Sequence, residues 1–421
     1  MSDPIDDPLA PRRAALNVLE AALSRRGGLD EALSSPAVLG LSARDRSFAR
    51  ALVMATLRHL GPIDRALSAR LKREPPALAL SLLRLGVAQA FWLDTPAFAA
   101  VDTTVTLAPK PLRGLINAVL RGLLRDGPPA PDPAHLAPDW LLSRWRQAFG
   151  EAEALTIAAA IAEEPATDLS VKSGIDLEPL AQLLEAQILP GGSLRTRRGG
   201  DITTWPGFAQ GQWWVQDASA AIPARLLQAK LGETVLDLCS APGGKTFQLA
   251  AAGAVVTALD RSENRLKRLR ESLVRLDQSA ETVVGDAANW QPGRTFDAVL
   301  LDAPCSATGT FRRHPDVLWN ARPGDIARLA VSQGRLLDAA ADHLKPGGLL
   351  VYSVCSLEPE EGEAQAMAML SRRSDLVMEP ITTGECGVPA ASVTDQGCLR
   401  ILPPHLAGGL DGFFIARFRK A

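Results

Sequence analysis

Two cysteines in the second half of the chain have the positions of reactive side chains. One ends the stretch Asp302-Ala-Pro-Cys305 and the other ends the stretch Tyr352-Ser-Val-Cys355, and each stretch follows an apolar run. A lone cysteine in such a place is most often a small buried hydrophobic residue. Two cysteines at the ends of strands that should be adjacent, both facing a cofactor crevice, favour instead a pair of thiols that reacts with a substrate.

Methylation of a cytosine at carbon 5 is a reaction that such a pair explains, because that carbon is a poor nucleophile. A thiolate that adds to carbon 6 would make the ring enamine-like, so that carbon 5 can take a methyl group. An acid must protonate or hydrogen-bond the ring nitrogen, and Asp302 is placed to do so. A base must then remove the proton from carbon 5 before the thiolate is eliminated.

The residues that would hold the methyl donor lie in the stretch Thr234–Thr246, around which the chain is organised. It reads Thr-Val-Leu-Asp-Leu-Cys-Ser-Ala-Pro-Gly-Gly-Lys-Thr. Residues 234–238 are typical of a buried parallel strand, a proline and two glycines then turn the chain, and a helix can begin at Thr246. A strand, a glycine turn and a helix N-terminus together form a nucleotide-type cradle.

Two ligand classes compete for this cradle. A phosphate-binding P-loop needs G-x-x-x-x-G-K-[ST], and the chain has Gly244-Lys245-Thr246 but places Cys239 where the first glycine is required. An adenosine-binding turn of a methyltransferase instead requires an acidic residue about 20 positions further on, at the end of the second strand. Asp260 follows the apolar run 255–259 and meets that requirement. We therefore expect S-adenosylmethionine rather than a nucleoside triphosphate.

Strands and helices alternate from Leu231 onward, which is typical of a doubly wound parallel sheet. The expected strands are 234–238, 254–259, 281–284, 296–302 and 348–354, and the most evident helices are 262–276 and 325–344. Ligands of such sheets bind at the carboxyl ends of the strands. Four aspartates fall at or near those ends, namely Asp237, Asp260, Asp286 and Asp302.

The first part of the chain predicts an all-α bundle with its own core. Apolar residues recur at helical spacing over 77–93, 98–107 and 112–124, and Ser42 is a candidate helix cap. Residues 127–138 contain five prolines and no periodicity, which is typical of a linker.

Between the linker and the sheet, the sequence predicts a helical stretch and then a small mixed module. Residues 139–162 are helical in pattern, and residues 169–212 combine short strand-like runs with one helix over 177–187. A basic cluster, Arg195, Arg197 and Arg198, is expected in a loop of this module, where it would suit phosphate contact.

Composition is that of an ordinary globular protein. The 421 residues suggest two or three domains, and the apolar fraction of 47% with 22% charged residues provides ample material for a core. Five cysteines without metal-ligand spacing favour a reducing cytoplasm over a disulfide framework, and no metal is expected. No apolar run approaches the length of a membrane span, and the net charge of −2 does not identify a partner.

The motifs of the chain, in their order, resemble those of the RNA cytosine-5 methyltransferases of the NOL/NSUN/Sun family. The resemblance covers nearly the whole chain. The motifs that carry it are Val215–Ser219, Cys239–Lys245, Asp302–Gly309, Arg312–Asp316 and Asp411–Ala416. The segment Gly114–Arg121 resembles the NusB-type RNA-binding domain that one bacterial subgroup carries.

The resemblance implies a multidomain protein with a cytosine in small-subunit (16S) ribosomal RNA as its substrate. The implied domains are a NusB-like all-α RNA-binding domain over 1–127, a proline-rich linker over 128–138, a small α+β RNA-binding subdomain over 139–212, and an α/β Rossmann-like methyltransferase domain over 213–421. The cofactor would be S-adenosylmethionine, and the enzyme would be a cytoplasmic monomer without membrane attachment.

Roles for single residues also follow from the resemblance. Cys355 would be the nucleophile, and Cys305 would assist release of the methylated product. Asp260 would hold the ribose and Asp286 would lie near the adenine. The complete set expected to line the cofactor site is Cys239, Ser240, Ala241, Pro242, Gly243, Gly244, Lys245, Asp260, Asp286 and Asp302. For Lys245, a surface position at the start of a helix is the alternative.

Two positions depart from the family pattern, and two other functions stay open. Val354 stands where the family usually has threonine, and Gly362 follows Pro-Glu-Glu where the family has asparagine.

DNA cytosine-5 methylation would use Cys305 as the nucleophile and leave Cys355 dispensable. A NusB-like assembly factor with a decayed catalytic domain is the non-enzymatic alternative. No role is evident for Cys386 or Cys398.

Overall fold

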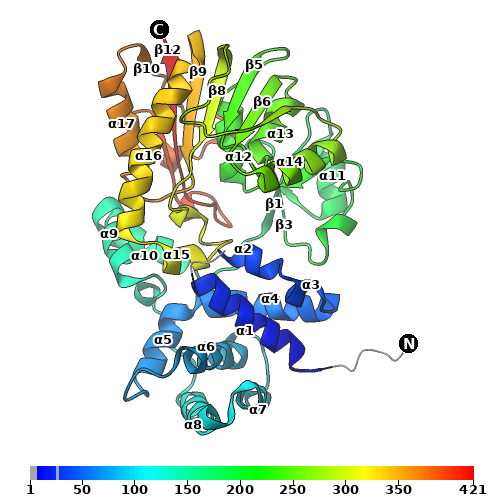
Figure 1. Cartoon of the computed structure of the whole chain (residues 1–421), viewed down its shortest axis with the longest axis vertical. Coiled ribbons are helices and arrows are strands. Elements are labelled where there is room, and N and C mark those ends of the chain that lie inside the picture. The colour runs from blue at the N-terminus through cyan, green and yellow to red at the C-terminus, as the bar shows by residue number, and fades with distance from the viewer. Residues whose placement is uncertain (1–6, 25–27) are drawn as a thin grey trace. The chain divides into compact units, whose positions relative to one another are not determined.

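The computed structural model describes residues 7–24 and 28–421, and its internal contacts divide the chain into two units (Figure 1). The first, here called the helical unit, comprises Met1–Glu164 and Phe311–Asn320. The second, the sheet unit, comprises Pro165–Thr310 and Ala321–Ala421. Within the described parts of the chain, no helix has both the length and the apolar character that crossing a membrane requires.

The helical unit confirms the predicted all-α bundle. Its helices are α1 (Ala10–Leu23), α2 (Gly28–Leu33), α3 (Pro36–Leu39), α4 (Ala43–Arg58), α5 (Leu60–Ser68), α6 (Ala77–Trp92), α7 (Ala97–Leu107), α8 (Lys110–Asp126), α9 (Asp139–Phe149), α10 (Glu151–Ala159) and α15 (Asp316–Asn320). Helices α1 to α8 bury one continuous apolar cluster. Ser42 caps α4 as expected, because its side chain accepts a hydrogen bond from the Asp45 N–H at 3.1 Å.

A segment from far along the chain completes the helical unit. Phe311 is buried against Trp145 of α9, with ring centroids 5.8 Å apart. The buried guanidinium of Arg58 donates to the carbonyl oxygens of Ile161 (3.1 Å), Glu163 (2.8 Å) and Arg312 (2.7 Å). The contacts therefore divide the chain at 164/165 and around 311–320, not at the proline-rich stretch. The domain limits drawn from the sequence remain a prediction.

The sheet unit begins with a small antiparallel sheet of order β2-β3-β1-β4. Its elements are β1 (Thr167–Val171), α11 (Leu177–Leu184), β2 (Gln187–Ile188), β3 (Leu194–Thr196) and β4 (Trp213–Val215). This is the mixed module predicted for 169–212. Arg195 was expected in a loop, but it lies buried in β3 and pairs with the buried Asp168 at 2.7 Å. Its side chain is used inside the module, so the expectation of phosphate contact was wrong for this residue.

The large sheet has eight strands, seven of them in the order β10-β12-β9-β8-β5-β6-β7, with β11 pairing on β12. The strands are β5 (Thr234–Leu238), β6 (Val255–Asp260), β7 (Glu281–Val284), β8 (Phe296–Asp302), β9 (Leu344–Val354), β10 (Leu376–Met378), β11 (Leu399–Ile401) and β12 (Phe413–Lys420). The five strands from β5 to β9 are parallel and match the predicted ones.

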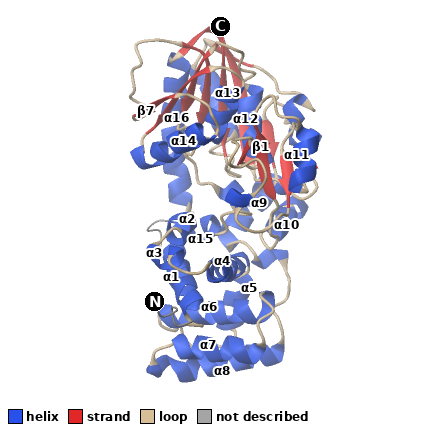
Figure 2. Cartoon of the chain, turned by 90° about the vertical axis from the view of Figure 1, so that its right-hand side faces the viewer, coloured by secondary structure: helices blue, strands red, loops and turns tan. Residues whose placement is uncertain are grey.

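The prediction of a parallel sheet was wrong at one edge, where β12 runs antiparallel to β9 and pairs with β10 and β11. Helix Glu363–Arg372 still connects β9 to β10, but no α-helix of the described chain lies between β10 and β12. Strand β12 therefore returns without the crossover helix that a parallel pair requires. Helices α12 (Ala218–Leu226), α13 (Gly244–Ala251) and α14 (Glu263–Arg275) pack on one face. Helices α16 (Pro323–Asp342) and α17 (Glu363–Arg372) pack on the other face. Figure 2 shows the strands of the sheet unit in red among its helices in blue.

Candidate active site

The two candidate cysteines lie together at the carboxyl ends of adjacent strands. Strands β8 and β9 are parallel neighbours in which Asp302 is paired with Ser353. A few residues beyond that pair, the Sγ atoms of Cys305 and Cys355 lie 3.5 Å apart. The predicted adjacency of the two strand ends is therefore confirmed. A separation of 3.5 Å allows one thiol to donate a hydrogen bond to the other sulfur.

The surroundings of the Cys305 thiol disfavour its ionised form. The pKa of the Cys305 thiol is raised well above its ordinary value, first by its hydrogen bond with Cys355 and then by burial. Cys305 therefore favours the protonated form and can donate to the Cys355 sulfur. Cys239, in the loop after β5, has its pKa raised to about 12 by burial, which disfavours the thiolate that a nucleophile needs.

Asp302 connects the cysteine loop to the glycine turn. Its Oδ2 lies 2.7 Å from the Nζ of Lys245, and its Oδ1 accepts a hydrogen bond from the Ser353 hydroxyl at 2.7 Å. The side chain of Lys245 is only 10% exposed, so the alternative of a surface lysine is wrong. The carboxylate is a third exposed and thus open to a ligand at this edge of the sheet.

The glycine turn has the geometry that the sequence predicts. Gly243 has φ of +114°, and a Cβ there would lie 2.5 Å from the ring of Phe247. Only glycine is compatible with both constraints. Gly244 begins α13, and a Cβ at this residue would lie 3.2 Å from the side chain of Gln216. The backbone of residues 239–245 therefore turns tightly above the carboxyl end of β5.

Two buried oxygens of this region have no hydrogen-bond partner among the described residues. They are the Oδ1 of Asp237 and the Oγ of Ser240. The other oxygen of Asp237 accepts from the Thr246 hydroxyl at 2.6 Å, and burial raises the pKa of Asp237 to about 7. Orphaned acceptors beside a glycine turn suit the polar groups of S-adenosylmethionine, so the residues present fit this cofactor. Asp237 was noted from the sequence only as a strand-end acid, and not as a site residue.

The remaining two aspartates lie at the same edge of the sheet. Asp260 ends β6, and its carboxylate accepts from the Ala241 N–H (3.2 Å), the Ser262 N–H (2.9 Å) and Arg265 (3.1 Å). Asp286 follows β7, is exposed, and accepts from the Ala288 N–H at 3.1 Å. Asp260 therefore fastens the glycine turn to α14, while Asp286 faces solvent.

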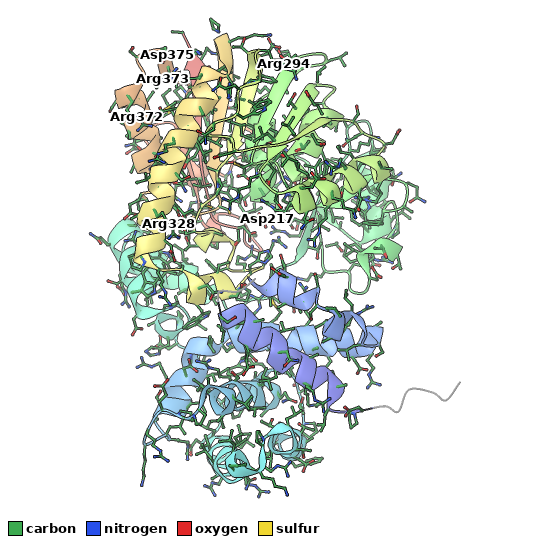
Figure 3. The ribbon with its side chains drawn as sticks, in the orientation of Figure 1. Asp217, Arg294, Arg328, Arg372, Arg373 and Asp375 are labelled. Atoms are coloured by element: carbon green, nitrogen blue, oxygen red, sulfur yellow. The ribbon has the colours of Figure 1, made fainter. Side chains whose placement is uncertain are left out.

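The motifs Val215–Ser219 and Asp302–Gly309 both form hydrogen bonds with the motif Asp411–Ala416. The Oδ1 of Asp217, at the start of α12, accepts from the backbone N–H groups of Ser219 (2.9 Å) and Asp411 (3.2 Å) (Figure 3). Gly412 donates its N–H to the Gly309 carbonyl oxygen at 2.8 Å. A Cβ on Gly309 would collide with the Gly412 carbonyl, so the two loops approach as closely as glycine allows.

The two departures from the family pattern have structural counterparts. Val354 is fully buried in the apolar cluster between the large sheet and α16. At Gly362 a Cβ would collide with the guanidinium of Arg400, which donates to the Ser356 carbonyl and to both carboxylate oxygens of Glu363 (2.9 and 2.6 Å). Arg400 therefore occupies the space that an asparagine side chain would need.

Sequence reasoning missed one group of residues beside the cysteines. Ser306 and Ser356, which directly follow the two cysteines, both donate to the carboxylate of Glu361. Glu361 is fully buried. The local signal for this group in the sequence is the run Pro-Glu-Glu that precedes Gly362.

The mixed eight-stranded sheet, the glycine turn and the acids at the strand ends define a Rossmann-like methyltransferase that uses S-adenosylmethionine. The chain belongs to the family of ribosomal RNA small subunit methyltransferase B. It is 36% identical to the protein of that name from Pseudomonas syringae pv. tomato, with 97% of each chain covered. It is likewise 36% identical to that of Vibrio cholerae, again over 97% of each chain.

Sequence profiles and solved structures agree with this assignment. The profile of the 16S rRNA methyltransferase RsmB/F family matches residues 224–419, and that of the NusB family matches residues 9–125. A solved methyltransferase homologue from Pyrococcus horikoshii is 32% identical, with a TM-score of 0.58 over 68% of this chain and 95% of that one. Another crystal structure, 24% identical, superposes with a TM-score of 0.80 over 99% of this chain and shares the fold.

Proposed function

We propose that the protein methylates carbon 5 of a cytosine in small-subunit ribosomal RNA through a covalent adduct with Cys355. The observation that carries the proposal is the pair of thiols 3.5 Å apart at the ends of adjacent strands, next to Asp302. The names of the relatives support ribosomal RNA as the substrate. The target cytosine must be unpaired or flipped out, because its ring must meet a thiol and a methyl donor at once.

In the first step the Cys355 thiolate attacks carbon 6 of the cytosine. A sulfur–carbon bond forms, and the electron pair of the carbon 5–carbon 6 double bond becomes available at carbon 5. S-adenosylmethionine, when bound, supplies an electrophilic methyl group to carbon 5 and keeps the electrons of the broken bond on its sulfur. To stabilise the negative charge that the attack places on the ring nitrogen, the Asp302 carboxyl, 2.7 Å from Lys245, must act in its protonated form and donate its proton in a hydrogen bond to that nitrogen.

Release of the product needs a second proton transfer. A base removes the proton from carbon 5, the double bond re-forms, and the electrons of the sulfur–carbon bond return to Cys355 as a thiolate. Cys305 assists this step, because its Sγ lies 3.5 Å from the sulfur that must leave. The two cysteines thus act at opposite ends of one reaction: Cys355 in attack and Cys305 in release.

Methyl transfer from labelled S-adenosylmethionine to unmodified 16S ribosomal RNA tests the proposal. Wild type is compared with Cys355→Ala and Cys305→Ala, and denaturing gels detect covalent protein–RNA adducts. We expect Cys355→Ala to be inactive and free of adduct, and Cys305→Ala to accumulate adduct. The proposal is wrong if Cys305→Ala is inactive without adduct while Cys355→Ala still methylates, or if cytosine-containing DNA of the same sequence is the better substrate.

A further inference from the structure

One buried carboxylate joins the loops that carry the two thiols. The Oε1 and Oε2 of Glu361 accept the backbone N–H of Ser306 at 2.9 and 3.2 Å, and the carboxylate also accepts the Ser306 hydroxyl. From the other loop, the Ser356 hydroxyl donates to Oε2 at 2.6 Å. Ser306 directly follows Cys305 and Ser356 directly follows Cys355, so a single side chain holds the residue after each thiol.

Two further side chains hold Glu361 in place, one at its carboxylate and one at its backbone. Gln333 of α16 donates its amide to Oε1 of Glu361 at 3.1 Å and to the Pro304 carbonyl oxygen at 2.9 Å. The phenol of Tyr352, in β9, donates to the Glu361 backbone carbonyl at 2.6 Å. Glu361 and Gln333 are both fully buried, so these bonds form in a low-dielectric interior where they are strong and costly to lose.

The two serines depend on this carboxylate to different degrees. Ser356 has other attachments: Arg400 donates to its carbonyl oxygen, and its hydroxyl accepts the Glu358 N–H at 3.0 Å. For Ser306, the Glu361 carboxylate accepts both the backbone N–H and the hydroxyl. Loss of Glu361 would therefore release Ser306, the residue directly after Cys305, more than Ser356, while the Pro304 carbonyl keeps its bond from Gln333.

We propose that Glu361 is a positioning residue that holds the Cys305 loop against the Cys355 loop and thereby keeps the second thiol at the distance that product release requires. The expected effect of Glu361 on catalysis rests on the proposed function. The effect of Glu361 on the positions of the two thiols does not depend on the substrate. Glu361 positions the thiols through its hydrogen bonds with Ser306 and Ser356, the residues that directly follow the cysteines.

Because Glu361 is charged, its replacement should change the pH dependence of Cys305 reactivity, which loss of an uncharged contact would not do. The negative charge of Glu361 contributes to the raised pKa of Cys305, after the hydrogen bond with Cys355 and burial. Removal of that charge lowers the pKa of Cys305. The pH at which the Cys305 thiol becomes reactive should then fall, because the thiolate is the form that alkylating agents attack.

The test uses the full-length Glu361→Gln variant, which preserves the shape of the side chain but turns an NH₂ group toward the donors. The matched control is Glu360→Gln, which makes the same change at the exposed neighbouring glutamate. Three quantities are measured: turnover with the fraction of enzyme held as RNA adduct, S-adenosylmethionine affinity by calorimetry, and the pH profile of iodoacetamide labelling at each cysteine by peptide mass spectrometry. Ser306→Ala, which leaves the backbone N–H in place, is the second variant in case Glu361→Gln does not fold.

We expect Glu361→Gln to lower turnover by about 100-fold, the effect of a misplacement of about 1 Å. Adduct should accumulate, cofactor affinity should stay near the wild-type value, and the labelling profile of Cys305 should move to lower pH. Ser306→Ala should show the same accumulation to a smaller extent, and Glu360→Gln should match wild type.

Two results would overturn the positioning role. One is a loss of turnover in Glu361→Gln without added adduct and without a shift in Cys305 labelling, which would make Glu361 a general support of the fold. The other is an equal response of Glu360→Gln. If Cys305→Ala forms no adduct with cytosine RNA but the labelling shift is present in Glu361→Gln, the proposed function fails and the positioning role stands.

Discussion

The Nζ of Lys245 lies 2.7 Å from the Oδ2 of Asp302, and this ion pair joins the helix of the glycine turn to the strand that leads to Cys305. The lysine side chain is 10% exposed and the aspartate 33%, so the pair is shielded on the lysine side and accessible on the aspartate side. A residue of the glycine turn therefore fixes the position of the acid that the proposed function places against the substrate ring.

Replacement of Lys245 by methionine should reduce methyl transfer by about 10- to 100-fold, since a charge-assisted hydrogen bond of about 1.5–3 kcal/mol is lost. Steady-state methylation with calorimetric titration of S-adenosylmethionine measures the effect. Lys345→Met is the control, because Lys345 forms an equally short pair with Asp297 (2.6 Å) but is 41% exposed. Equal losses in both variants would contradict the importance of the Lys245 pair.

Asp237→Asn should change how stability depends on pH. Burial raises the pKa of Asp237 from 3.8 to about 7, so between these values the folded protein keeps a proton that the unfolded chain has lost. Stability from this group is present below pH 3.8 and is lost as the pH rises to 7. Asparagine keeps an acceptor for Thr246 without titrating. The free energy of unfolding of the variant, relative to wild type, should rise between pH 4 and 7 and level off above; denaturant melts that give a pH-independent difference would refute this.

Phe311→Ala should destabilise the helical unit by about 3–5 kcal/mol, because a fully buried aromatic ring is removed from a packed site. The neighbouring Trp145 provides a fluorescence signal for the melt. Phe98→Ala, in the same unit but at a 79% exposed position, should change stability by less than about 0.5 kcal/mol. Similar melting temperatures for the two variants would show that Phe311 does not contribute to this core.

Asp168→Ala should destabilise the sheet unit by about 3–5 kcal/mol, because the buried Arg195 keeps its charge and loses its partner. Asp168 also accepts from the Ala218 N–H at 3.1 Å, so the start of α12 loses a contact as well. The control is Glu185→Ala, which breaks the pair of Arg198 with an 81% exposed glutamate and should cost little. Denaturant titration that gives equal midpoints for the two variants would contradict the prediction.

The sequence was most informative where local pattern decides structure. The strands 234–238, 281–284 and 296–302 have the predicted limits, because short apolar runs bounded by turn residues have few alternatives. The meeting of Cys305 with Cys355 also followed from local pattern. Parallel neighbours end at one edge of a sheet, and the two cysteines follow their strands at similar distances.

Features that depend on distant partners were not predictable in this way. Glu361 is a charged residue in a turn, and nothing local indicates that two serines about five and fifty-five positions away donate to it. In the sequence, Arg195 forms a basic cluster with its neighbours. In the structure, Asp168, 27 positions earlier in the chain, lies on the adjacent strand and pairs with the Arg195 side chain. The β12 strand was not assigned a direction, because its neighbours β9 and β10 are brought to it only by tertiary packing.

The position of residues 311–320 in the chain delays completion of the helical unit during synthesis. The ribosome completes residues 1–164 of the helical unit and must then add about 150 residues before Phe311 and Arg312 emerge. At roughly 5–20 residues per second this is a wait of roughly 7–30 s. During that time Trp145 lacks the ring that packs on it, and Arg58 lacks one of its three carbonyl acceptors. The helical unit is therefore complete only after the loop that carries Cys305 has been synthesised.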